Sequence, residues 1–281
     1  MKLSVFYDHI LDASRQSGIP SADLAVYCHD WGIRAVELKY AYLKEHEDTL
    51  LPELNHAGLS ISCLYEFFDF GRNPDTSSAK EMLQTAALLS VSKVLVIPGS
   101  LDPQEADCLN ALRDDYHATE QFMNHSKAIN SMRQALGELT ALGQELGVTV
   151  TLEDFDGNVQ PFHCKNQLLW FMKHVPSLRY TLDMGNFAFC DEDVMLAYET
   201  LSDFIVHVHC KDRAPDASCT GRFGRGMGPC AAGEGYIPIR RLIDLLRTRG
   251  YDGYLAIEHF GAPDQMNTIR QSAHYLQNCI C

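Results

Sequence analysis

The sequence lacks the long hydrophobic runs of membrane proteins. No segment approaches the roughly 18 uninterrupted apolar residues that a membrane-spanning helix needs. The N-terminal stretch MKLSVFYDHILD is only briefly apolar before Asp8 interrupts it, so it does not resemble a signal peptide. We therefore expect a soluble, cytoplasmic protein that does not bind membranes.

Basic residues are also in short supply. Lys and Arg total 23 against 37 Asp and Glu, which gives a net charge of −14 with histidine neutral. Phosphate backbones are bound by basic surfaces, so this balance argues against stable binding of DNA or RNA. It suits a site that concentrates carboxylates. The expected partner is a small molecule, and association with further copies of the chain is left open.

Ten cysteines are present, but they form no CxxC pair and no regular spacing. A chain of 281 residues with 46% apolar residues can build a core without disulfides. We expect reduced thiols. A zinc cluster is the weaker alternative, because the paired spacing of such sites is missing.

Short β-type runs alternate with helical stretches along the whole chain. The expected strands are 3–7, 33–38, 59–64, 93–97, 148–153, 178–183, 204–209 and 254–258. The expected helices are 21–32, 47–58, 77–90, 118–147, 166–175, 191–201, 237–250 and 264–277. Several of these helices end in a glycine, which is typical of a helix C-cap.

This alternation predicts an α/β fold with a parallel sheet. Eight right-handed βα units, about 250 residues in total, close into a single (β/α)8 TIM barrel. A doubly wound open sheet is the alternative, but no Gly-rich phosphate turn follows an early strand. No low-complexity linker divides the chain, so one domain, 1–281, is expected. Two long loops, 98–117 and 213–235, would emerge at the catalytic face, as substrate loops or as variable insertions.

Four of the expected strands end in a side chain that can bind a metal. Side chains alternate between the two faces of a strand, so a strand whose other face is apolar turns these groups inward. Carboxylates crowded at one mouth repel each other unless a cation compensates. A divalent ion would do so, with Mn²⁺ expected and Mg²⁺, Co²⁺ or Zn²⁺ as alternatives. The alternative is that each of these residues separately caps its strand or forms an ion pair. The four residues are Glu153, Asp183, His209 and Glu258.

Four segments in order resemble the sugar isomerase/epimerase group of the xylose-isomerase-like barrels, which share their fold with endonuclease IV. The segments are TLEDF, TLDMGNF, HVHCKD and GYDGYLAIEHFG. The resemblance covers essentially the whole chain and implies that the same four residues are metal ligands. Asn186 stands where many relatives carry a substrate-binding histidine. Ketose 3-epimerases carry a further glutamate after the fifth-strand ligand, where this chain has only Asp154 and Asp156.

The resemblance implies a metal-dependent isomerase or epimerase of a small sugar, keto-sugar or polyol, with or without a phosphate, acting through an enediolate. Glu153 and Glu258 would transfer the proton from opposite sides. An inosose-dehydratase-like lyase is the closest alternative. A non-catalytic sugar-binding subunit and an endonuclease IV-like nuclease are further ones. The expected substrate-binding residues are Asn186, His207, Lys211 and Arg213.

Three of these expectations have alternatives. His207 lies one pleat deeper than His209 and could instead pack beside the site or hydrogen-bond a carboxylate that binds the metal. Lys211 could instead be a solvated lysine that does not contact the substrate. Arg213, Arg222 and Arg225 belong to the loop 213–235, where they either clamp a substrate phosphate or carboxylate or form part of a solvated lid.

Overall fold

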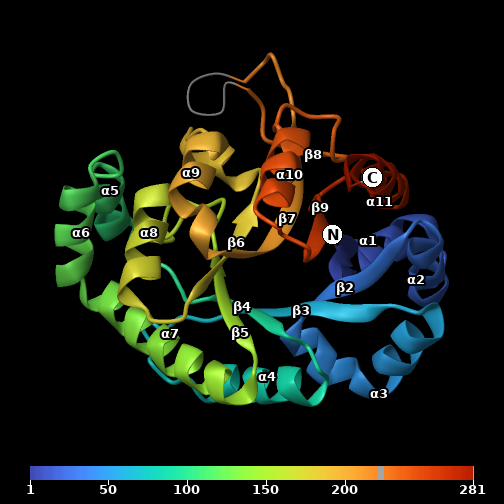
Figure 1. Ribbon diagram of the computed structural model, residues 1–281, viewed down its shortest axis with the longest axis horizontal. Coiled ribbons are helices and arrows are strands. Elements are labelled where there is room, and N and C mark those ends of the chain that lie inside the picture. The colour runs from blue at the N-terminus through green and yellow to red at the C-terminus, as the bar shows by residue number, and fades with distance from the viewer. Residues whose placement is uncertain (220–224, 281) are drawn as a thin grey trace. The chain divides into compact units, whose positions relative to one another are not determined.

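The computed structural model describes residues 1–219 and 225–280, and its contacts divide the chain into two compact units. The first unit is 1–63 together with 207–281, and the second is 64–206. Both are built from parallel strands connected by helices (Figure 1). None of the described helices combines the length and the apolar character that crossing a membrane requires.

In the first unit, strands from the two ends of the chain pair with each other. β1 lies between β2 and β9, and β9 also pairs with β7, all in parallel. α1 packs against α2 and α11 (Figure 1). The strands are β1 (Lys2–Phe6), β2 (Ile33–Lys39), β7 (Ile205–Ala214), β8 (Gly228–Cys230) and β9 (Tyr254–Glu258). The helices are α1 (Tyr7–Ser17), α2 (Ser21–Asp30), α3 (Tyr40–Ala57), α10 (Ile239–Thr248) and α11 (Gln265–Ile280).

In the second unit, four parallel strands follow one another in sequence order. β3 (Ser60–Phe67) begins in the first unit and pairs here with β4 (Lys93–Ile97). β5 (Thr149–Glu153) pairs with β4 and with β6 (Arg179–Asp183). The helices are α4 (Ser77–Leu88), α5 (Pro103–Asn110), α6 (Tyr116–His125), α7 (Lys127–Leu146), α8 (Lys165–His174) and α9 (Val194–Leu201). Two short 3₁₀ helices are η1 (Asn186–Cys190) and η2 (Ser202–Phe204).

The longest helix, α7, covers β5 because glycine allows a close approach. α7 packs against α4 and β5 (Figure 1). A Cβ atom at Gly143 would lie 2.5 Å from the carbonyl oxygen of Val148, a separation that real Cβ atoms do not show. The apolar face of β5 is fully used by this packing, since Val150 and Leu152 are 1% and 0% exposed. Its other face is left to polar side chains, as the alternation predicts.

All eight expected strands are found among the described residues, but several connections differ from expectation. The segment after β1 is the helix α1, which the sequence pattern did not predict. Its buried residues are Tyr7, His9, Ile10 and Ala13. The loop 98–117 contains α5, and the loop 213–235 contains β8, which pairs antiparallel with the end of β7.

The single helix expected over 118–147 is two helices, α6 and α7. Ser126 separates them with extended backbone angles, φ −68° and ψ 125°. Its hydroxyl group accepts a hydrogen bond from the backbone N–H of Ile129 at 3.2 Å and donates one to Glu105 at 2.5 Å. Serine at this position is therefore an N-cap, which begins a new helix rather than continuing the old one.

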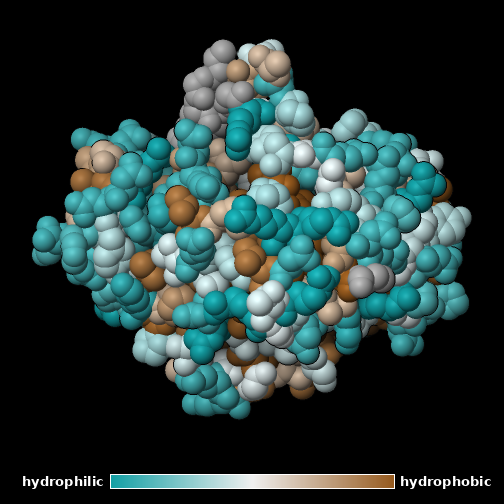
Figure 2. Space-filling view, turned by 45° about the horizontal axis from the view of Figure 1, so that its top comes forward, coloured by the Kyte–Doolittle hydropathy of each residue, from teal (hydrophilic) through white to brown (hydrophobic). Residues whose placement is uncertain are grey.

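Hydrophilic side chains dominate the face seen in Figure 2, in keeping with the charged composition. Large hydrophobic side chains that are exposed among the described residues lie far apart in the sequence. They are Tyr27, Phe67, Leu88, Leu196 and Phe260.

Candidate functional site

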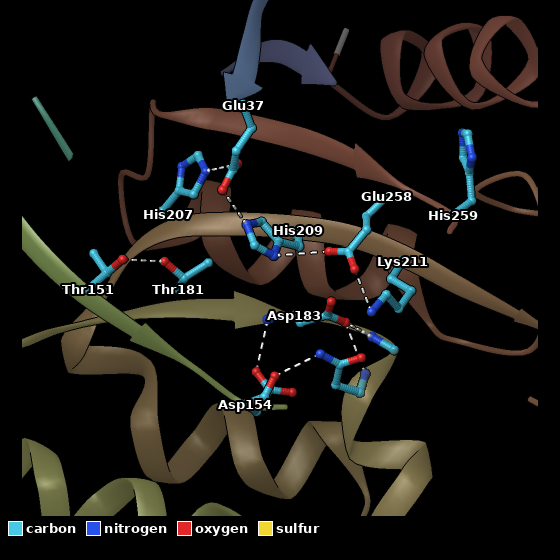
Figure 3. Close-up of polar contacts among 12 residues, drawn as sticks. Glu37, Thr151, Asp154, Thr181, Asp183, His207, His209, Lys211, Glu258 and His259 are labelled. Atoms are coloured by element: carbon cyan, nitrogen blue, oxygen red, sulfur yellow. Dashed lines mark hydrogen bonds and ion pairs between the residues drawn. The ribbon is translucent and has the colours of Figure 1, made fainter. Parts of the chain in front are cut away.

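In the first unit, β7 and β9 bring a carboxylate, an imidazole and an ammonium group together. Lys211 lies opposite Glu258 in the parallel register, and His209 lies one pleat earlier on the same face. The Nδ1 atom of His209 lies 3.1 Å from Oε2 of Glu258, and Nζ of Lys211 lies 2.5 Å from its Oε1 (Figure 3). All three residues are at least nine-tenths buried.

The charge state of Glu258 follows from these neighbours. Burial by itself would raise the pKa of this carboxyl group, because it penalises the charged form. The positive charge of Lys211 and the neighbouring imidazole of His209 outweigh burial and hold the pKa of Glu258 well below its usual value. Glu258 is therefore ionised at neutral pH beside the ammonium group of Lys211, a setting that a bound cation would also provide.

A second buried carboxylate, Glu37, was not singled out from the sequence. Its oxygens lie 2.8 Å from Nε2 of His207 and 3.1 Å from Nε2 of His209 (Figure 3). Burial raises the pKa of Glu37, but the two histidines lower it to about 2. The alternation of side chains along β2 could have indicated this residue. Ile33, Ala35 and Glu37 share one face of the strand, so an acidic side chain lies near the end of an otherwise apolar face.

In the second unit, Glu153 and Asp183 end the neighbouring strands β5 and β6. Oδ1 of Asp183 accepts the backbone N–H groups of Gly185 and Asn186 at 2.7 and 3.0 Å, so it fixes the turn that follows β6. Behind the strand ends, Thr181 donates to Thr151 at 2.8 Å (Figure 3). Both carboxylates are buried, with 7% and 0% exposure.

The carboxylate of Asp154 fixes the backbone at the end of β6, where Asp183 lies. Its Oδ1 accepts hydrogen bonds from the hydroxyl of Tyr180 at 2.5 Å and from the backbone N–H of Asp183 at 2.9 Å. Burial, and then the charge of Asp183, raise the pKa of Asp154 well above its usual value. Asp154 thus orders the end of β6, a role different from the second glutamate of the ketose 3-epimerases.

The four expected substrate-binding residues have different partners. The side-chain amide of Asn186 donates to the carbonyl oxygen of Asp154 at 2.7 Å, so it connects β6 with β5. His207 is fully buried and contacts Glu37, the hydrogen-bonding role that was the alternative for it, although with an unexpected carboxylate. Lys211 pairs with Glu258. Their contact with a substrate stays a prediction.

The arginines of the loop 213–235 are tied to the loop itself. Nη1 of Arg213 donates to the carbonyl oxygen of Met227 at 3.2 Å, beside β8. The guanidinium of Arg225 lies 5.3 Å from the ring centre of Tyr236. Arg222, the third arginine considered, lies outside the described residues.

The donor chemistry of the predicted site suits a divalent cation. Its three carboxylates are buried at strand ends and its imidazole is buried within β7, and oxygen donors with one nitrogen fit Mn²⁺, Mg²⁺, Co²⁺ or Zn²⁺. Burial of uncompensated carboxylates is costly, and a cation removes this cost. In the first unit, donor atoms of Glu37, Cys63 and His207 also lie within 4.8 Å of one another. The nine described cysteines are all free thiols.

Several solved structures align with this chain over nearly its whole length. A D-tagatose 3-epimerase-like protein aligns with a TM-score of 0.71 and 17% identity, covering 100% of this chain and 98% of that one. A probable 3-DHS dehydratase from Bacillus anthracis aligns with a TM-score of 0.68 and 18% identity over 99% of both chains. An IOLI protein with a bound zinc atom aligns with a TM-score of 0.69 and 18% identity, covering 100% of this chain and 98% of that one. At these identities the similarity shows the fold.

An uncharacterized protein of Methanocaldococcus jannaschii is 26% identical over 136 residues, which are 48% of this chain. The match spans about half the length of that relative, 51%. The model of the xylose isomerase-like TIM barrel family matches residues 26–279, nearly the whole chain. This match confirms the expected fold class and the expected resemblance: the chain belongs to the xylose isomerase-like TIM barrel family.

Proposed function

We propose that this protein is a metal-dependent isomerase or epimerase of a small sugar, keto-sugar or polyol, with or without a phosphate. The observation that carries the proposal is the buried contact of Glu258, the last residue of β9, with His209 and Lys211 of β7. Such a cluster contributes little to packing, but it supplies a base, a metal ligand and an acid within one site.

We further propose that the chain forms one barrel domain, 1–281. Glu153, Asp183, His209 and Glu258 would then bind one divalent cation, with Mn²⁺ expected. Glu153, Asp183 and Glu258 are the last residues of β5, β6 and β9, and His209 contacts Glu258 from within β7, which supports this assignment. In TIM-barrel enzymes, active sites lie at this end of the strands.

When bound, the cation would supply Lewis-acid stabilisation of the negative charge that develops on neighbouring substrate oxygens. Glu258 is ionised and buried, so it can remove a proton from the carbon next to a carbonyl group. Lys211 can donate a hydrogen bond to the substrate oxygen that becomes negative. Glu153 would deliver a second proton from the other side, while Glu258 keeps the one that it removed. Delivery to the same carbon inverts that centre. Delivery to the former carbonyl carbon, with a hydroxyl proton passing between the two oxygens, exchanges aldose and ketose.

A lyase is the second candidate, and the similarity in fold to a probable 3-DHS dehydratase favours considering it. It would share the proton removal by Glu258. The reaction would then continue with loss of hydroxide from the adjacent carbon, assisted by a proton from Lys211, instead of return of a proton to carbon.

The test is metal analysis of the purified protein, followed by NMR of candidate sugars incubated with it in D₂O. Solvent deuterium at one carbon of a recovered sugar indicates isomerisation or epimerisation, whereas a dehydrated product indicates the lyase. Replacing Glu258 by Gln should lower turnover by roughly 10²–10⁴ without unfolding the protein. Glu145, an exposed residue of α7, provides the matched control Glu145→Gln with unchanged turnover. Full activity of Glu258→Gln would refute the assignment.

A further inference from the structure

A carboxylate from one side of the first unit reaches two imidazoles on another strand. Glu37 belongs to β2, whereas His207 and His209 belong to β7, and β1 and β9 lie between these strands in the sheet. All three side chains are 0% exposed. The contacts are 2.8 Å to His207 and 3.1 Å to His209, one to each carboxylate oxygen (Figure 3).

This bridge determines which ring nitrogens carry hydrogen. An ionised carboxylate can only accept hydrogen bonds, so the Nε2 atom of each histidine must be the donor. In a neutral imidazole the other nitrogen, Nδ1, then holds the lone pair. For His209, Nδ1 is the atom that lies 3.1 Å from Glu258. The nitrogen facing the proposed ligand carboxylate is thereby the one that can bind a metal.

Packing alone does not account for Glu37. A buried carboxylate carries a large desolvation cost, and an apolar side chain of similar volume would fill the same space without it. The surrounding residues of β2 are apolar: Ala35, Val36 and Leu38 are each at most 1% exposed. A charged group at this position is therefore accounted for by the two imidazoles that it holds.

We propose that Glu37 is a positioning residue: it fixes the ring orientation and tautomer of His209, so that Nδ1 faces Glu258 and the cation site. The proposal rests on the proposed function, because it assigns His209 as a metal ligand. His207 occupies the second oxygen of Glu37 and prevents that carboxylate from rotating away. Hydrogen bonds of this kind orient metal-binding histidines and raise their basicity.

The variant Glu37→Gln tests this directly because it keeps the volume and removes one acceptor. Its amide oxygen can accept from only one histidine, while its NH₂ group faces the other and requires a lone pair on that Nε2. Metal affinity, measured by titration calorimetry with Mn²⁺, should fall by about 10–100-fold. The matched control is Val36→Ala, which removes buried packing beside Glu37 and leaves both of its contacts with the histidines in place. Its Mn²⁺ affinity should stay within about threefold of wild type. Equal losses in the two variants would assign the effect to packing and overturn the proposal.

The tautomers provide a readout that is independent of activity. Long-range ¹H–¹⁵N NMR of the metal-free protein should show Nε2-bound hydrogen on both histidines in the wild type. In Glu37→Gln, one of the two should lose or shift that signal. Nδ1-bound hydrogen alone on His209 of the wild type would refute the proposal.

Two further outcomes separate this proposal from other readings. Wild-type protein that binds no divalent cation would refute the proposed function, whereas normal binding that Glu37→Gln leaves unchanged would refute the role of Glu37 alone. Two equivalents of metal, one lost in Cys63→Ser, would also overturn the proposal. Glu37 would then be a ligand beside Cys63 and His207, whose donor atoms lie within 4.8 Å of one another.

Discussion

A single aspartate holds the base of the long loop after β7, and its replacement should be costly. Asp212 is 1% exposed, and its carboxylate accepts four backbone N–H groups. Oδ1 accepts those of Arg213 and Ile237 at 2.9 and 3.1 Å. Oδ2 accepts those of Gly233 and Gly235 at 2.9 and 3.0 Å. Asp212 therefore connects the strand that carries His209 and Lys211 with the segment that returns from β8.

The magnitude follows from counting the bonds that are lost. In Asp212→Asn an NH₂ group replaces one oxygen, so two backbone donors face another donor whichever way the amide turns. A hydrogen bond to a charged group contributes about 1.5–3 kcal/mol, and two of them give about 3–6 kcal/mol. The loop can move aside and recover part of this loss with water. We therefore expect the free energy of unfolding to fall by about 3 kcal/mol.

Urea denaturation followed by circular dichroism measures this change, and hydrogen exchange localises it. The amides of Gly233 and Gly235 should exchange faster in Asp212→Asn, while those of α7 in the second unit should not. The matched control is Asp216→Asn in the same loop, where an exposed carboxylate accepts from the backbone and hydroxyl of Ser218 and from the thiol of Cys219. That change should cost less than about 0.5 kcal/mol. Equal costs for the two variants, or unchanged exchange at both glycines, would show that the four bonds do not hold the loop.

Three further predictions concern pH, thiol chemistry and helix capping. Burial lowers the pKa of His259 to about 4, so its contribution to stability is complete above pH 6.5 and is lost as the pH falls towards 4. His259→Phe should remove up to about 3 kcal/mol of this acid dependence, measured by urea unfolding at several pH values. Burial raises the pKa of the Cys28 thiol to about 12, so iodoacetamide should label exposed Cys108 first, as mass spectrometry can determine. Ser126→Ala should lower the free energy of unfolding by about 1 kcal/mol, since it removes the N-cap of α7; an unchanged denaturation midpoint would contradict this.

The parts of the fold that depend on neighbouring residues could be read from the sequence. Alternation within a strand depends only on the backbone, so the burial of Val150 and Leu152 and the opposite face of Glu153 followed from their order. The same parity placed His209 and Lys211 on one face of β7, and the structure places both beside Glu258. The four motifs, taken in order, predicted the family to which the chain belongs.

Contacts between distant segments were decided only by the tertiary structure. Glu37 reaches His207 and His209 across 170 and 172 residues, and nothing in the sequence near β2 indicates which strand its carboxylate meets. α1 packs against α2 and α11, and α11 comes from the other end of the chain. Periodicity reports the face that a residue occupies, whereas its partner depends on how elements far apart in the chain come together.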